Sequence, residues 1–387
     1  MSSNVLATST NVTDQYLSTM VYQTSVSSMN IAINKVWVNN INSDTFLVEM
    51  NSCSCLTKIS PVGLDTIMIK VKSWGYLFDD ELNGKFKYSD SIVAYFANNI
   101  PISKYFWFTD DEQGVYWITG DSVWGPVHTN GVINTSGSPV FHDKVTAQLG
   151  ISPDPLSSAA QFNGGWEIGV INDIPTNMSY ITDAAILGNA GAATNTKCIY
   201  DLAVSFDFQA DGSVIRTVQG NPPDTVIFSD IAPTQAITST ADIRVKGTFN
   251  GQATLYTTAN IWVDDDLVYA DDPISNPNSD DLLGLIANNN IYITDNAANN
   301  NNVNLQACMM AVNGSFTAEN YSTRPLSGQL NTTGSIVQKL RGPVGTFSGG
   351  SITTGFQKHY RFDSRLGSLS PPNYPYIKSL SLVTWWE

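Results

Sequence analysis

The chain has 387 residues, of which 42% are hydrophobic and 14% are charged, and its formal net charge at pH 7 is −15. Nine tryptophans, 16 tyrosines and 16 phenylalanines provide enough apolar surface for a core, which argues against a disordered chain. The acidic balance argues against binding to nucleic acid or to an anionic membrane, because both need a basic patch.

The first predicted element is a helix over residues 12–38, with Thr13 as its candidate N-cap. Leu17, Met20 and Ile31 belong to an apolar stripe at helical spacing, and no glycine or proline interrupts it. The stripe is thin and rich in serine, threonine and methionine. It therefore favours a helix that lies on a β-body or packs against neighbouring subunits over one at the centre of a core.

The same region predicts no membrane anchor. The chain contains no apolar run of the roughly 18 residues that a membrane-spanning helix needs. Met1-Ser2-Ser3-Asn4 does not begin a basic segment followed by an apolar one, as a signal peptide would. Membrane anchoring is therefore expected only if an N-terminal leader is missing from this chain.

The apolar period changes to two from Val36 onward, which predicts β-strands separated by Asn, Ser, Gly and Pro clusters. Residues 150–195 are rich in loop residues, with one short helix expected around 181–187. Prolines 222, 223 and 233 suggest a boundary near residue 230. The expected organisation is a helical segment over 1–40, a β-rich domain over 41–230 and a β-solenoid-like domain over 231–387.

The most regular pattern runs from Ile243 to Val263, where every odd position is apolar or small and the even positions are mostly polar. The alternation survives two glycines, which suits a strand that bends at glycine corners. Asn260-Ile261-Trp262-Val263 is echoed by Asn290-Ile291-Tyr292-Ile293. Short strands, asparagine-rich corners and loose repetition predict a mainly β fold with a parallel β-solenoid (β-helix) in the C-terminal half. An antiparallel sandwich is the structural alternative.

The densest acidic cluster comprises Asp264, Asp265, Asp266, Asp271 and Asp272, followed by Asp280 and Asp281. Carboxylates on turns suit calcium, so these residues are a candidate metal site. Their spacing matches no EF-hand loop, and a solvated acidic loop is the alternative that we prefer. A pair of such carboxylates also serves acid/base hydrolysis of glycans, but only at a fixed separation.

The other chemistry-bearing residues form no known catalytic pattern. Cys198 and Cys308 are either a disulfide or buried free thiols, and Cys53 and Cys55 lie too close together for an unstrained bridge. The histidines lack the spacing of a zinc enzyme, and neither a nucleophile motif nor a phosphate loop is present. No catalytic or cofactor-binding residue is therefore predicted.

Three segments in the same order carry a resemblance to a known family. They include Trp124-Gly125-Pro126-Val127-His128, then Asp281-Leu282-Leu283-Gly284-Leu285, and finally Gly355-Phe356-Gln357-Lys358-His359-Tyr360 with the terminal Trp386-Glu387. Together they resemble an uncharacterised family of bacterial surface proteins, often joined to a minor-pilin-like (type IV pilus-associated) N-terminal helix. The resemblance implies an exported β-rich ectodomain without known enzymatic activity. The cleavage site and apolar helix of pilin-like relatives do not appear here.

The resulting hypothesis is a structural, non-enzymatic subunit of an extracellular or cell-surface bacterial assembly, which is pilus-associated, a filament or a surface layer. Its partners would be copies of itself or other surface subunits, and not nucleic acid. The alternatives are a carbohydrate-active β-helix enzyme that uses the Asp264–Asp281 carboxylates, and a viral capsid or tail-fibre protein.

Overall fold

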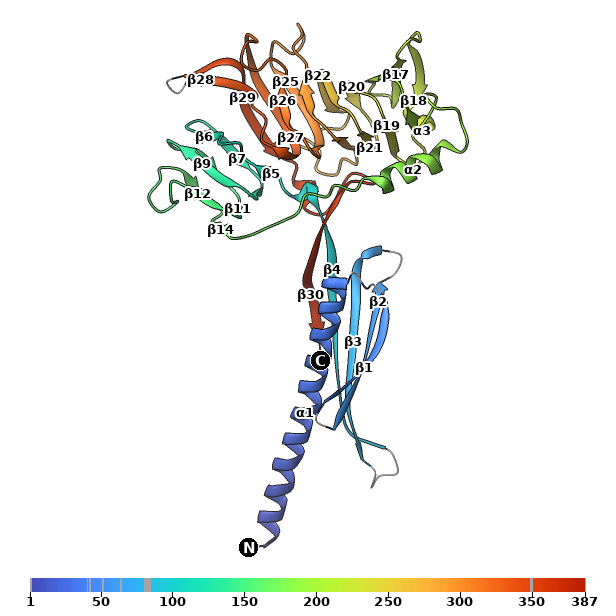
Figure 1. Ribbon diagram of the computed structural model, residues 1–387, viewed down its shortest axis with the longest axis vertical. Coiled ribbons are helices and arrows are strands. Elements are labelled where there is room, and N and C mark those ends of the chain that lie inside the picture. Colours follow the sequence, from blue (N-terminus) through green and yellow to red (C-terminus); the bar gives the residue numbers. More distant parts are fainter. Residues whose placement is uncertain are drawn as a thin grey trace. The chain divides into compact units, whose positions relative to one another are not determined.

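The computed structural model describes residues 2–39, 41, 43–50, 52–62, 65–79, 85–348 and 351–386 (Figure 1). Its contacts divide the chain into two compact units. The first unit comprises Met1–Ile100 and Lys378–Glu387, and the second comprises Pro101–Ile377. The chain therefore leaves the first unit after its fourth strand and returns to it for its fifth and last strand, so that the second unit is an insertion.

The first unit is one long helix on a five-stranded sheet, with strand order β1-β2-β3-β4-β30. Neighbouring strands from β1 to β4 are antiparallel. Its elements are α1 (Ser2–Asn39), β1 (Asp44–Met50), β2 (Cys53–Val62), β3 (Asp65–Asp79), β4 (Lys85–Pro101) and β30 (Tyr376–Trp386).

Helix α1 confirms the predicted N-terminal helix, but its bounds differ from the expected 12–38. It begins at Ser2, so Thr13 lies within the helix and does not cap it. Val36 and Val38, expected to start a strand, are also helical. Val36 is buried in a cluster that includes Ile59 of β2, and this tertiary burial outweighs the modest preference of valine for strands.

The second unit holds the remaining elements, and short strands dominate it. The first group is η2 (Ile102–Lys104), β5 (Trp107–Asp111), β6 (Tyr116–Ile118), β7 (Ser122–Trp124), β8 (Val127–Thr129), β9 (Val132–Ser136), β10 (Val140–Phe141), β11 (Val145–Ala147), β12 (Gly150–Ser152), β13 (Gln161–Phe162), β14 (Trp166–Ile168), α2 (Ser179–Asn189), β15 (Ile199–Tyr200), β16 (Val204–Phe208), β17 (Ser213–Val218) and β18 (Asp224–Ile227). The second group is α3 (Phe228–Ile231), β19 (Ala236–Ser239), β20 (Ile243–Phe249), β21 (Gln252–Thr257), β22 (Ile261–Tyr269), β23 (Leu282–Ala287), β24 (Ile291–Ile293), β25 (Val303–Ala311), β26 (Phe316–Ala318), β27 (Leu326–Leu340), β28 (Gly345–Ser348), β29 (Ser351–Phe362) and η3 (Ser364–Gly367).

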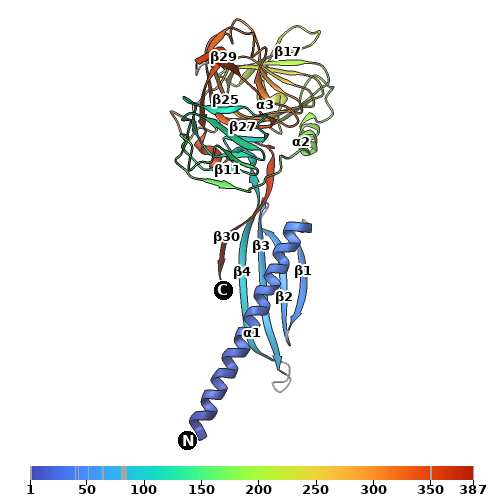
Figure 2. The same ribbon diagram turned by 60° about the vertical axis from the view of Figure 1, so that its left-hand side comes forward.

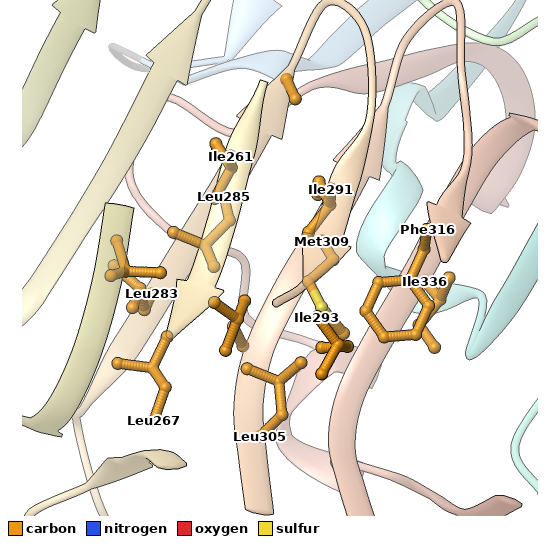
Figure 3. Packing of buried hydrophobic residues seen from close by; sticks show 14 of the residues in the cluster. Ile261, Leu267, Leu283, Leu285, Ile291, Ile293, Leu305, Met309, Phe316 and Ile336 are labelled. Carbon is orange, nitrogen blue, oxygen red and sulfur yellow. The ribbon is translucent and has the colours of Figure 1, made fainter. Parts of the chain in front are cut away.

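Parallel pairing between strands that are not consecutive in the chain builds the interior of the second unit. Leu255 pairs with Leu285, Leu285 with Met309, Met309 with Ile336, and Ile336 with Trp107 of β5. These side chains are buried and belong to one apolar cluster. Figure 3 shows several of them, together with Ile261 and Ile291, packed between the strands. One apolar row therefore runs across successive strands of the sheet.

The expected parallel β-solenoid over residues 231–387 is not shown in the form predicted. The sheet is mixed, because β16–β17, β17–β18 and β28–β29 are antiparallel, and it is not closed. Antiparallel hairpins arise where a short turn returns the chain beside itself, and alternation of apolar residues alone does not distinguish this from a stacked coil. The coarser expectation, a mainly β protein with an N-terminal helix, is confirmed.

The alternation at 243–263 is confirmed as an inside and an outside except at Thr254, an even position that is buried. Val245, Phe249 and Leu255 are buried, whereas Lys246 and Gln252 are half-exposed. The glycine corner is real: Gly251, with a φ of 125°, separates β20 from β21, and such a φ strains any residue that has a Cβ.

The echoed segments also lie side by side. Ile261, Trp262 and Val263 pair in register with Ile291, Tyr292 and Ile293. The rings of Trp262 and Tyr292 stack with their centroids 4.5 Å apart.

The expected boundaries near residues 40 and 230 do not coincide with the two units. The segment 1–40 is not separate, because α1 packs on β2 and β3. Residue 230 lies within the second unit, where β16 pairs in parallel with β20 across it. The prolines at 222, 223 and 233 therefore mark turns inside a continuous sheet.

Candidate functional site

The buried face of α1 is made of small and medium-sized side chains. Val21, Ser25, Ser28, Ala32 and Val36 are buried at three- and four-residue spacing, which places them on one side of the helix. Short side chains let the helix axis approach the sheet closely. The carboxy-terminal half of α1 is thereby held firmly on its own sheet.

Two polar contacts fix the position of this half. The Ser28 and Thr57 hydroxyls lie 2.5 Å apart in the helix–sheet interior. Lys35 Nζ donates to Asp44 Oδ2 at 2.6 Å, and this hydrogen bond lowers the pKa of the Asp44 carboxyl. The second pair is partly exposed, so its contribution to stability is small.

The amino-terminal half of α1 is differently placed. From Val12 to Met20 no described side chain is buried, and Val12 and Tyr16 are 61% and 64% exposed. In Figures 1 and 2 this part of the helix diverges from the strands toward the N-terminus. An isolated helix of this length is marginal in water, because helices gain most of their stability from tertiary packing.

Beside the packed half of α1 lies an apolar groove, which we call the α1–β4 groove. Its volume is about 260 Å³. Its lining residues come from three elements: Tyr22, Val26, Met29, Asn30 and Ile33 of α1, Ile92, Ala94 and Phe96 of β4, and Leu382 and Trp385 of β30. Asn30 is the one polar residue among them, so the groove suits an apolar occupant.

Strand β30 closes this side of the sheet as its last strand. Leu382, Val383, Trp385 and Trp386 are about half exposed on it, and the Trp386 ring lies 5.2 Å from that of Tyr95. The ordinary expectation for a terminal Trp-Trp pair is burial against the body. Here Leu382 and Trp385 instead border the groove, and Trp386 contacts Tyr95.

The predicted acidic residues are spread over several separate interactions. Asp264 accepts hydrogen bonds from Arg244 and Thr294, and Asp266 accepts two from Asn304. Asp265 accepts from a backbone N–H, Asp271 from Asn276, and Asp272 from Gln306 and a backbone N–H. Among the described residues, no three His, Cys, Asp or Glu side chains form a group able to hold a metal. Calcium binding here remains a prediction.

The cysteines, His128 and His142 lie in packing and hydrogen-bonding contacts within the protein. All four cysteines are free and buried, and burial raises the pKa of the Cys198 and Cys308 thiols. His128 is buried between Thr146 and Asn130, at 2.7 and 3.0 Å from its two ring nitrogens. Burial also lowers the pKa of His128. His142 stacks on Trp124, with ring centroids 4.6 Å apart.

Sequence reasoning located the helix but missed the groove. The residues Tyr22, Val26, Met29 and Ile33 recur at four- and three-residue steps, which is a second apolar stripe beside the one that was identified. Residues 92–96 form a continuous apolar run, which is consistent with a buried strand. The sequence therefore contains a signal for the α1 and β4 sides of the groove. It contains none for the position of β30 beside them.

The fold defines a class of protein in which one long helix lies on a small sheet. A β-rich unit is inserted in the chain before the last strand of that sheet. No family model matches the chain, and no curated protein does. Among solved structures it is similar to the competence-associated pilin ComZ from Thermus thermophilus, with 12% identity and a TM-score of 0.43, over 90% of this chain and 88% of that chain. A likeness at this level leaves the function to be argued from the residues of this chain.

No described helix has both the length and the apolar character that crossing a bilayer requires.

Proposed function

We propose that the protein is a structural subunit of an extracellular bacterial assembly, either pilus-associated, a filament or a surface layer. In this assembly the amino-terminal half of α1 (residues 2–20), which we call the free half because it diverges from its own sheet, lies in the α1–β4 groove of the next copy. The proposal rests on one observation: the same chain has both an exposed helix segment and an exposed apolar groove. The role proposed is subunit packing, without enzymatic activity.

The width of the sheet beside α1 supports a helix as the occupant of the groove. Helix α1 covers β2 and β3, which leaves β4 and β30 beside it on the same sheet. Neighbouring strands are spaced by about 4.8 Å, so two strands offer roughly the 10 Å width of one helix. A second helix alongside α1 would cover this remaining strip.

The chemistry of the two surfaces is also complementary. Val12, Tyr16, Leu17 and Met20 supply apolar side chains on the free half of α1. Full burial of one such side chain is worth about 1.5–3 kcal/mol. Several together offset the cost of ordering a helix that one copy leaves in water.

The two surfaces of the proposed contact permit open assembly. The free helix segment and the groove are different surfaces, so the contact between two copies is heterologous. A heterologous contact whose rotation does not close generates a filament. Each added copy would carry its own free helix and its own groove, so growth could continue.

Removal of the free helix tests the proposal. A variant lacking residues 2–20 should keep the β-structure seen by circular dichroism and should lose the oligomer seen by light scattering and electron microscopy. A companion variant, Trp385→Ser with Leu382→Ser, should have the same effect because both side chains are exposed groove residues.

The matched control is Leu187→Ser, which changes an apolar side chain that is 76% exposed on α2 of the second unit. It should assemble like the unaltered protein. A full-length protein that stays monomeric at all concentrations would contradict the proposal. If that monomer degraded a polysaccharide, the enzyme alternative would replace it.

A further inference from the structure

Two of the buried ion pairs in the second unit join residues that are far apart in the sequence. Arg341 and Glu112 are joined at 2.6 Å, with side chains 1% and 2% exposed. Lys358 and Asp121 are joined at 3.1 Å, with side chains 10% and 8% exposed. Moving charges out of water is costly, so buried pairs of this kind call for a reason.

A tight turn holds Asp121 in place. The Asp121 N–H donates to the Ile118 carbonyl at 3.0 Å, and the Ile118 N–H donates back to Asp121 Oδ2 at 3.0 Å. Gly120, between them in the chain, has a φ of 96°, which only glycine adopts readily in such a turn. One carboxylate oxygen is therefore fixed by a backbone N–H, and the carboxyl group has a single orientation.

Lys358 reaches this carboxyl from β29. Its Nζ donates to Asp121 Oδ2 and lies 5.2 Å from the ring centroid of Trp117 and 5.9 Å from that of Phe347. Burial, followed by the nearby Arg341 cation, lowers the pKa of Lys358 to about 8. A desolvated amine with a depressed pKa is a nucleophile at neutral pH.

We propose that Lys358 and Asp121 join in an intramolecular amide bond, which makes the second unit covalently cross-linked. The inference rests on the contact of amine and carboxyl within an aromatic, largely buried site, and it is independent of the proposed assembly.

The reaction is a dehydration and needs no oxidant or reductant. The reaction starts from the form of the pair in which one proton has passed from Lys358 Nζ to Asp121 Oδ1, which leaves a neutral amine and a carboxylic acid. The Nζ lone pair attacks Asp121 Cγ, and the Ile118 N–H stabilises the negative charge that develops on Oδ2. A proton of the amine passes to Oδ1, the Cγ–Oδ1 bond breaks, and one water molecule leaves.

Two features of the site favour the product. Amine and carboxyl are held together, and effective molarities for such oriented groups reach about 10⁵–10⁸ M, which offsets the excess of water. A cavity of about 290 Å³, lined by both residues together with Thr119, Gln357 and Ser351, provides a space into which the released water can leave.

The exposed ion pair of Lys339 and Asp110 makes a useful comparison. Its side chains are 47% and 29% exposed, so water competes with the amine and keeps both groups charged. No amide is expected there, although the ionic partners are of the same types.

Intact-mass spectrometry of the purified, folded protein tests the proposal. The mass should fall below the sequence mass by one water. Trypsin should not cleave after an acylated lysine, so a branched peptide joining residues 105–144 to residues 342–361 should appear. Lys358→Arg and Asp121→Ala should each restore the full sequence mass. Lys339→Arg should keep the loss of water.

Asp121→Asn provides a second, independent readout. Its reaction would release ammonia and yield the same cross-link, so its final mass should equal that of the cross-linked unaltered protein. A folded protein with its full sequence mass would overturn the proposal. So would a loss of water that peptide analysis places elsewhere, such as at Asp211-Gly212, where succinimide formation has the same mass change.

Discussion

Leu255 shows most directly that the alternation of side chains along a strand predicts burial. It pairs with Ile237 on one side and Leu285 on the other, and all three side chains are fully buried. Leu255→Ala should lower the free energy of unfolding by about 2–5 kcal/mol, because it leaves a cavity in a row of packed side chains. Urea titration would measure this. Lys246→Ala and Gln252→Ala, on the outer face, should each change it by no more than about 1 kcal/mol. Equal losses at all three positions would contradict the assignment of an inner face.

Glu112 represents the opposite case, a buried charge. Its carboxylate accepts from Arg341, Thr109 and Trp107. Glu112→Ala should cost about 3–5 kcal/mol in thermal or urea unfolding, because it leaves the Arg341 cation buried without its partner. Lys339→Ala breaks an exposed pair and should cost at most about 1 kcal/mol. A small loss at Glu112 would mean that water reaches this site.

The acidic cluster at 264–272 yields a prediction about metal. Each of these carboxylates already accepts a hydrogen bond from the protein. Removal of calcium with a chelator should therefore leave the melting temperature unchanged, since an ion held only by the folded state would stabilise it. A fall in melting temperature that calcium reverses would establish the calcium site instead.

At the residue scale, the sequence was informative where neighbours in the chain decide the outcome. The odd positions of 243–263 could be predicted as buried because a strand alternates its faces. The partners of Glu112 and Asp121 could not, because Arg341 and Lys358 lie 229 and 237 residues away. A single sequence contains no local signal for such a pair.

Among the elements, α1 is the one that has two roles. Its residues from Val21 to Val36 belong to the core of the first unit. Deletion of all of 12–38 is therefore expected to unfold the helix–sheet unit, in contrast to deletion of 2–20. The sequence left open whether 12–38 lies on a β-body or packs against neighbouring subunits: residues 21–36 lie on their own sheet, and contact with a neighbouring subunit stays a proposal for the amino-terminal half.

The close fit of α1 on its sheet can be tested at one position. Ala32 is fully buried at the helix–sheet contact. Ala32→Leu should lower the stability of the first unit by about 1–3 kcal/mol, because overpacking forces the helix away from β2 and β3. Gln23→Leu, on the exposed side of the same helix, serves as the control and should be nearly silent in urea unfolding. Equal effects would mean that the helix does not lie as described.

At the scale of elements, helix 181–187 and the two echoed strands at 261 and 291 were predicted because their signals are local. The mixed character of the large sheet was not predicted. A turn between β16 and β17 reverses the chain, whereas the glycine corner after β20 does not, and both turns contain glycine. The hydrogen-bond partner of a strand depends on where the chain returns, and alternation is silent on that point.

For the whole molecule, the insertion of one unit into the other was beyond reach of the sequence. The last strand, β30, pairs with β4 of the first unit although the entire second unit separates them in the chain. Its destination depends on a contact of high sequence separation, which no periodicity encodes.

The two ends of that insertion lie next to each other: the Ile102 N–H donates to the Pro375 carbonyl at 3.1 Å. Replacement of residues 102–375 by a short glycine-rich turn should therefore leave a small soluble protein with the helical signal of α1. The second unit is therefore an insert that can be exchanged for another without altering the first unit. Natural variation or engineering could replace the whole insert while leaving unchanged the helix–sheet unit that we propose to mediate assembly.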